Sequence, residues 1–121
     1  NLDMFEEMKF ASLLQKSQGN PVVMSAAETF NMATINGAKA FRLNIGELKE
    51  GKLADLLLIN LKDTSLTPTH NLISNLVYSA NGSCVDTTIC DGKILMQDRI
   101  VIGEDEIIFK AREVAKNLVN K

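Results

Sequence analysis

The segment Thr87-Thr88-Ile89-Cys90-Asp91-Gly92-Lys93-Ile94-Leu95-Met96 carries the clearest structural signal in the chain. Two strand-like runs flank Asp91-Gly92, a dipeptide that favours a two-residue type I′ turn because both positions take a positive φ. The segment therefore predicts an antiparallel hairpin, and we expect its first face to be core. The predicted pairs are Ile89 with Ile94 and Thr87 with Met96 on that face, and Cys90 with Lys93 and Thr88 with Leu95 on the other.

Short apolar runs on either side of this hairpin predict further strands. Asp55 to Leu61 and Leu76 to Ser79 are each expected to form a buried strand, because turn-forming residues bound these apolar runs. Ile100 to Ile102 is expected to form another strand before Gly103. Together with the helices described next, these strands indicate a mixed α/β protein.

The first expected helix runs from Asp3 to Ser17. Asp3 is a suitable N-cap, and acidic residues in the first turn and Lys16 in the last turn complement the helix dipole. Its apolar residues spread over more than half of the helical circumference. We therefore expect neighbours to cover this helix on more than one side.

Two more helices are predicted downstream. Ser25-Ala26-Ala27-Glu28 has the spacing of a capping box, and small and aromatic residues then follow at helical intervals as far as Phe41, with a stop or jog at Asn36-Gly37. Asp105 is the expected N-cap of a C-terminal helix, in which Glu106 can pair with Lys110. Its predicted apolar stripe consists of Ile107, Ala111, Val114 and Leu118.

Composition excludes several classes of protein. The 121 residues are 45% hydrophobic and 23% charged, which is typical of one globular domain. A net charge of −2 gives no basic surface for nucleic acid or an anionic membrane, and the longest aliphatic run, Leu56 to Ile59, is too short to span a bilayer. The acidic start is unlike a signal peptide, so we expect a cytoplasmic protein. A helical pattern this close to Asn1 suggests a piece of a longer chain.

The segment Gly46-Glu47-Leu48-Lys49-Glu50-Gly51-Lys52 resembles a phosphate-binding P-loop. However, Leu53 replaces the Ser or Thr that would hold magnesium. A strand is also expected after the loop, where a P-loop requires a helix, and the two glutamates would repel an anion. We therefore interpret the segment as a structural turn rather than as a nucleotide site.

The titratable and nucleophilic residues form no recognisable catalytic set. His70 is the only histidine and stands in a polar loop, so a loop-packing or hydrogen-bonding role is expected. Cys84 and Cys90 are too far apart along an extended segment to form a disulfide. Lys93 could lower the thiol pKa of Cys90, but a buried, unreactive thiol is the expected state. We predict no catalytic, metal-binding or substrate-binding residue in this chain.

Three stretches nevertheless resemble the amidohydrolase superfamily, and the resemblance covers essentially the whole chain, from Asn1 to the final helix. They are Asn1 to Lys9, the pattern Gly46-x4-Gly51-Lys52-x-Ala54-Asp55-Leu56, and Asn75-Leu76-Val77-Tyr78-Ser79-Ala80 continuing through Asp91-Gly92-Lys93. Within the superfamily they are most similar to 5′-methylthioadenosine/S-adenosylhomocysteine deaminases and to related chlorohydrolases and guanine-deaminase-like enzymes. His70-Asn71-Leu72 and Gly82-Ser83-Cys84 depart from the usual His-Asp-Pro and Gly-Ser-Asp.

The resemblance implies a particular architecture for the parent protein. Residues 1–45 are expected to be the last helices of a metal-dependent (β/α)8 barrel. Residues 46–104 are expected to be strands of an adjoining composite β-sandwich, and residues 105–121 a terminal helix. The resemblance places every metal-binding residue of the parent upstream of Asn1, so this segment is expected to bind no metal or other cofactor.

The resemblance also implies a function. The parent is expected to be a zinc-dependent hydrolase that deaminates an adenosine-type nucleoside, and to be an oligomer, whereas this segment alone is expected to be inactive. Its partner is then the rest of the parent enzyme. A free-standing protein-interaction module without enzymatic activity is the alternative, because unpaired strand edges and apolar helix faces can also bind partners. The expected structural residues are Asp3, Gly46, Gly51, Ala54, Asp55, Asp91 and Gly92.

Overall fold

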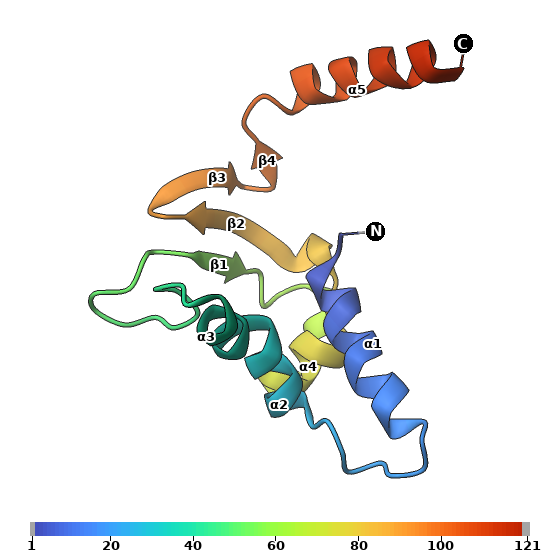
Figure 1. Ribbon diagram of the computed structural model, residues 1–121, viewed down its shortest axis with the longest axis vertical. Helices are drawn as coiled ribbons and strands as arrows, with labels where there is room; N and C mark the ends of the chain where they lie inside the picture. Colours follow the sequence, from blue (N-terminus) through green and yellow to red (C-terminus); the bar gives the residue numbers. More distant parts are fainter. Residues whose placement is uncertain (1, 120–121) are drawn as a thin grey trace.

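The computed structural model describes residues 2–119 as a mixed helical and sheet fold. Its α-helices are α1 (Met4–Lys16), α2 (Ala26–Asn31), α3 (Gly37–Phe41), α4 (Leu72–Tyr78) and α5 (Glu104–Val119). Its strands are β1 (Leu56–Ile59), β2 (Val85–Cys90), β3 (Lys93–Gln97) and β4 (Ile100–Val101). Helices α1 to α4 lie on the β1 side of the sheet, whereas α5 extends away beyond β4, at the other end of the strand order (Figure 1).

The sheet is antiparallel and has the strand order β1-β2-β3-β4. The predicted hairpin is confirmed at its turn, where Asp91 and Gly92 have φ angles of 48° and 73°. The pairs Ile89 with Ile94 and Cys90 with Lys93 are also confirmed.

The two outer pairs of the predicted register are wrong. A register shift between Thr88 and Ile89 places Thr88 opposite Met96, so Leu95 is an extra residue on β3. The face predicted to be core is buried only in part. Thr87 is buried, but Ile94 is 47% exposed.

The strand expected at Leu76 to Ser79 is also wrong, because this segment belongs to α4. The Asn71 side chain caps the helix by accepting a hydrogen bond from the Ser74 backbone N–H at 3.0 Å. Leu76 and Val77 are buried on this helix. A short apolar run is compatible with either a buried strand or a buried helix, so periodicity alone could not distinguish them.

The predicted starts of the first two helices are confirmed. Asp3 caps α1 through the backbone N–H of Phe5, and Ser25 and Glu28 form the expected capping box at the start of α2. The jog expected at Asn36-Gly37 takes the form of a π-helical segment, Met32–Asn36, between α2 and α3. Helix α1 buries only one side within the described residues, and Phe10, Leu13 and Leu14 remain exposed.

The core lies between the helices and one end of the sheet. It contains Phe5 and Met8 of α1, residues of α4, and the segment that leads into β2. Its buried members are Phe5, Met8, Leu66, Leu76, Val77, Ala80, Cys84 and Val85. Many large apolar side chains lie outside this small core, including Leu57 and Leu58 of β1, which are about half exposed.

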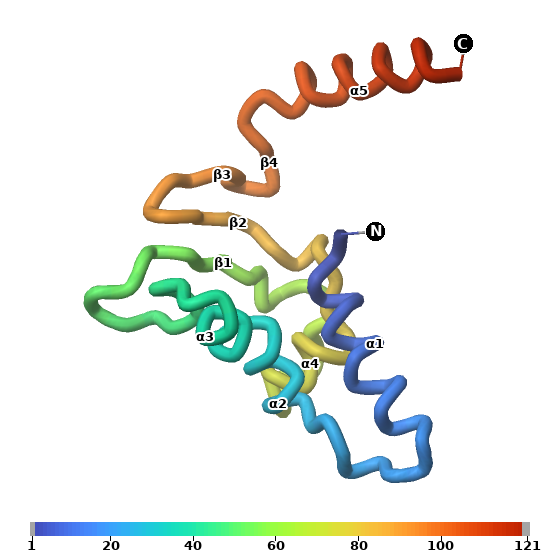
Figure 2. Tube along the Cα trace, in the orientation of Figure 1, coloured from blue at the N-terminus to red at the C-terminus, as the bar shows by residue number. Residues whose placement is uncertain are grey.

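Helix α5 differs from its prediction at its first residue. It begins at Glu104, and the Gly103 carbonyl accepts a hydrogen bond from the Ile107 backbone N–H. Asp105 is therefore an acidic residue of the first turn and not the N-cap. The predicted pair between Glu106 and Lys110 is confirmed. The backbone trace shows α5 apart from the helices that contribute to the core (Figure 2).

Candidate functional site

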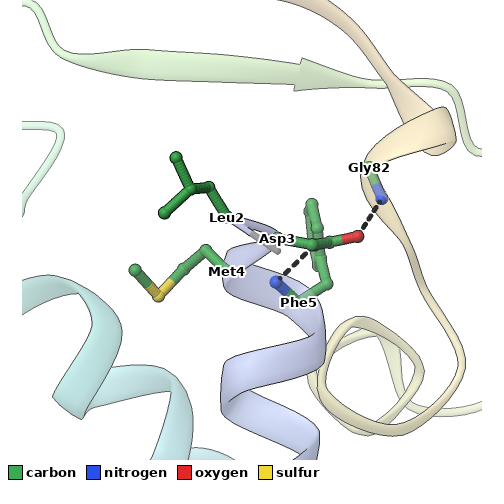
Figure 3. Close-up of a pocket in the computed structure, with 5 residues that line it drawn as sticks. All are labelled: Leu2, Asp3, Met4, Phe5 and Gly82. Carbon is green, nitrogen blue, oxygen red and sulfur yellow. Dashed lines mark hydrogen bonds between the residues drawn. The ribbon is translucent and has the colours of Figure 1, made fainter. Parts of the chain in front are cut away.

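Asp3 joins the start of α1 to the turn that leads into β2. Its Oδ1 accepts a hydrogen bond from the Phe5 backbone N–H at 2.9 Å, and its Oδ2 accepts one from the Gly82 backbone N–H at 3.1 Å. Figure 3 shows the carboxylate between these two donors, with Leu2 and Met4 extending in another direction. A pocket of about 410 Å³ lies beside this junction. Its lining is mostly apolar and contains no nucleophile.

A second pocket, of about 500 Å³, lies between α1, the segment from α2 to η1 (Met32–Asn36), and β1. Met8, Phe30 and Leu76 contribute apolar side chains to it, and Asp55 and Glu47 are its acidic lining residues. This lining favours contact with an apolar group.

The loop that resembles a P-loop is a structural turn, as predicted. Strand β1, and not a helix, follows it. Gly46 has a φ of 87°, and a Cβ atom there would lie 2.9 Å from the Ala38 Cβ and 3.0 Å from the Thr34 carbonyl oxygen. Glycine therefore allows the loop to approach η1 and α3. At the other end, the Gly51 carbonyl accepts a hydrogen bond from the Asn44 side chain at 2.7 Å.

The end of the same sequence pattern contacts the hairpin turn. The Asp55 Oδ1 accepts a hydrogen bond from the Asp91 backbone N–H at 2.6 Å, and the Ala54 carbonyl accepts one from the Gly92 N–H at 3.1 Å. Two parts of the sequence pattern that are 36 residues apart thus meet at the start of β1. The sequence identified these residues but not their contacts, because side-chain pairing between distant segments leaves no local pattern.

The two cysteines occupy different environments, and both are free. Cys84 is fully buried, as expected of a small apolar residue, and burial is the main cause that raises the pKa of its thiol. The expectation of a buried Cys90 is wrong, because its side chain is exposed. The negative charge of Asp55 is the main cause that raises the pKa of Cys90 above its usual value, and it outweighs Lys93. Neither thiol is therefore activated as a nucleophile.

The described residues do not fit a metal ion. Within residues 2–119, no group of three or more His, Cys, Asp or Glu side chains is arranged to hold one. His70 is exposed in the loop before α4. None of the helices in this range has the length and apolar content needed to span a membrane.

A buried polar cluster was not predicted from the sequence. The Ser12 hydroxyl donates a hydrogen bond to the Met24 carbonyl at 2.7 Å and is 2.8 Å from the Tyr78 hydroxyl. The Lys16 ammonium also donates to the Met24 carbonyl, at 3.0 Å. The cluster fixes the connection between α1 and α2, and none of its groups is left unpaired. We assign it a structural role.

Comparison with known proteins identifies the family of this chain. Residues 1–95 match the model of the amidohydrolase family. The chain is 49% identical, over 98% of its length, to a 5′-deoxyadenosine deaminase of Methanosphaera stadtmanae. It is 50% identical, also over 98% of its length, to 5-methylthioadenosine/S-adenosylhomocysteine deaminase 1 of Archaeoglobus fulgidus. It spans 28% and 29% of the length of these two relatives.

Two of the similar solved structures illustrate the shared fold. An adenosine deaminase of Xanthomonas campestris, crystallised with bound zinc, superimposes with a TM-score of 0.90 and 29% identity, over 98% of this chain and 28% of that one. Atrazine chlorohydrolase of Arthrobacter aurescens, complexed with zinc, gives a TM-score of 0.76 and 22% identity, over 92% of this chain and 25% of that one. This second likeness concerns the fold alone.

Proposed function

The chain belongs to the amidohydrolase family, and from this membership we propose that it is the C-terminal part of a metal-dependent aminohydrolase acting on an adenosine-type nucleoside. The observation that carries the proposal is the identity of about half of all residues with two adenosine-type deaminases over nearly the whole chain. The close superposition on a zinc-bound adenosine deaminase supports the same substrate class and zinc as the metal.

The proposed architecture explains which surfaces are exposed. Residues 1–45 would pack as terminal helices on a (β/α)8 barrel, residues 46–104 would complete a β-sandwich with strands from elsewhere in the parent, and residues 105–121 would form the terminal helix. The exposed apolar side of α1, with Phe10 and Leu14, supports burial against such a barrel. The partly exposed Leu57 and Leu58 of β1 support further covering of the sheet.

The proposed reaction replaces the amino group on a purine carbon with an oxygen atom from water. A C–O bond forms, the C–N bond breaks, and ammonia leaves. We assign no residue of this segment to these steps, because the described part of the chain offers neither a metal site nor an activated nucleophile. The metal and the substrate would be held by other residues of the parent, which we propose to be a cytoplasmic enzyme.

The segment would act by positioning. Asp3 fixes the start of α1 against Gly82, and Asp55 fixes the start of β1 against the hairpin turn. Misplacement of a reacting group by about 1 Å can reduce the rate on the order of a hundredfold. Rigid junctions in this segment would therefore affect the reaction without contacting the substrate.

The test is turnover by the full-length protein. We expect ammonia release from 5′-deoxyadenosine, 5′-methylthioadenosine or S-adenosylhomocysteine, loss of this activity after chelation, and recovery after zinc is added. A metal-loaded, folded protein that releases no ammonia from any adenosine-type nucleoside would contradict the proposal. Cytidine and guanine serve as controls for substrate class.

A further inference from the structure

We draw no further inference here: the strongest candidate, the apolar pocket of about 500 Å³ between α1, the segment from α2 to η1, and β1, carries no proposal because nothing in the structure shows what covers it.

Discussion

Two aspartate side chains, Asp3 and Asp55, connect segments that are far apart in the sequence. The Asp3 carboxylate uses both oxygens, one for the Phe5 N–H at the start of its own helix and one for the Gly82 N–H of a distant turn. Charge-assisted hydrogen bonds of this kind are stronger than neutral ones. Asp3 thus links a local cap to the tertiary fold.

Asp3→Ala should lower the free energy of unfolding of the full-length protein by about 1–3 kcal/mol, because two backbone donors lose their acceptor. Asp3→Asn should cost less, since its amide oxygen can still accept one of the two bonds. Glu7→Ala, at an exposed position of the same first turn, should change it by less than about 0.5 kcal/mol. Urea denaturation measures all three variants. Equal stabilities of Asp3→Ala and Glu7→Ala would show that the junction contributes nothing.

Asp55 also controls the ionisation of a neighbouring thiol. Its negative charge raises the pKa of Cys90. Asp55→Asn should therefore lower that pKa, increase the thiolate fraction at pH 8, and speed alkylation of Cys90 by iodoacetamide. Asp98→Asn is the control, because Asp98 is not among the groups that shift this pKa. An unchanged alkylation rate in Asp55→Asn would contradict the assignment.

At the scale of elements, glycines in one loop serve different purposes. Gly46 and Gly51 have similar φ angles, 87° and 82°, but only Gly46 faces close neighbours. Gly46 therefore sets how near the loop approaches η1 and α3, whereas Gly51 needs only its backbone conformation.

Gly51→Ala should cost about 1–2 kcal/mol of stability, from the strained φ alone. Gly46→Ala should cost about 3 kcal/mol or more, because a Cβ atom there would also collide with Ala38 and with the backbone at Thr34. Thermal unfolding of the two variants in the full-length protein provides the comparison. Equal losses of stability would mean that the loop can move away from these neighbours.

Local signals predicted some elements and missed others. Asp3, the capping box at Ser25 and the turn at Asp91-Gly92 were predicted correctly, because a cap or a tight turn depends on residues next to each other in sequence. Helix α4 was predicted as a strand, since a short apolar run fits both states. The extra residue at Leu95 and the junction between Asp3 and Gly82 depend on tertiary packing, which has no local pattern.

At the scale of the whole molecule, apolar surface is distributed unevenly. The core is small, whereas α1, β1 and α5 each expose large apolar side chains. The proposed function rests on the similarity to known deaminases, because residues 2–119 bring together no group of side chains arranged to hold a metal ion. The segment from Gly46 to Leu56 joins the helices to the sheet. Gly46 packs against Ala38 and Thr34, and Ala54 and Asp55 bind the hairpin turn.

The isolated 121-residue chain should therefore fail to melt cooperatively as a monomer. Exposed apolar surface at α1 and β1 favours self-association in the absence of the rest of the parent. Size-exclusion chromatography and calorimetry measure this. A monomer with one sharp, reversible transition would instead favour a free-standing interaction module.

The most direct test of the central claim compares ammonia release from 5′-deoxyadenosine by the full-length protein and by the 121-residue chain, both supplied with zinc. We predict steady turnover by the full-length protein and none by the chain alone. Turnover by the chain alone, or its absence from the folded, zinc-loaded full-length protein, would contradict the account.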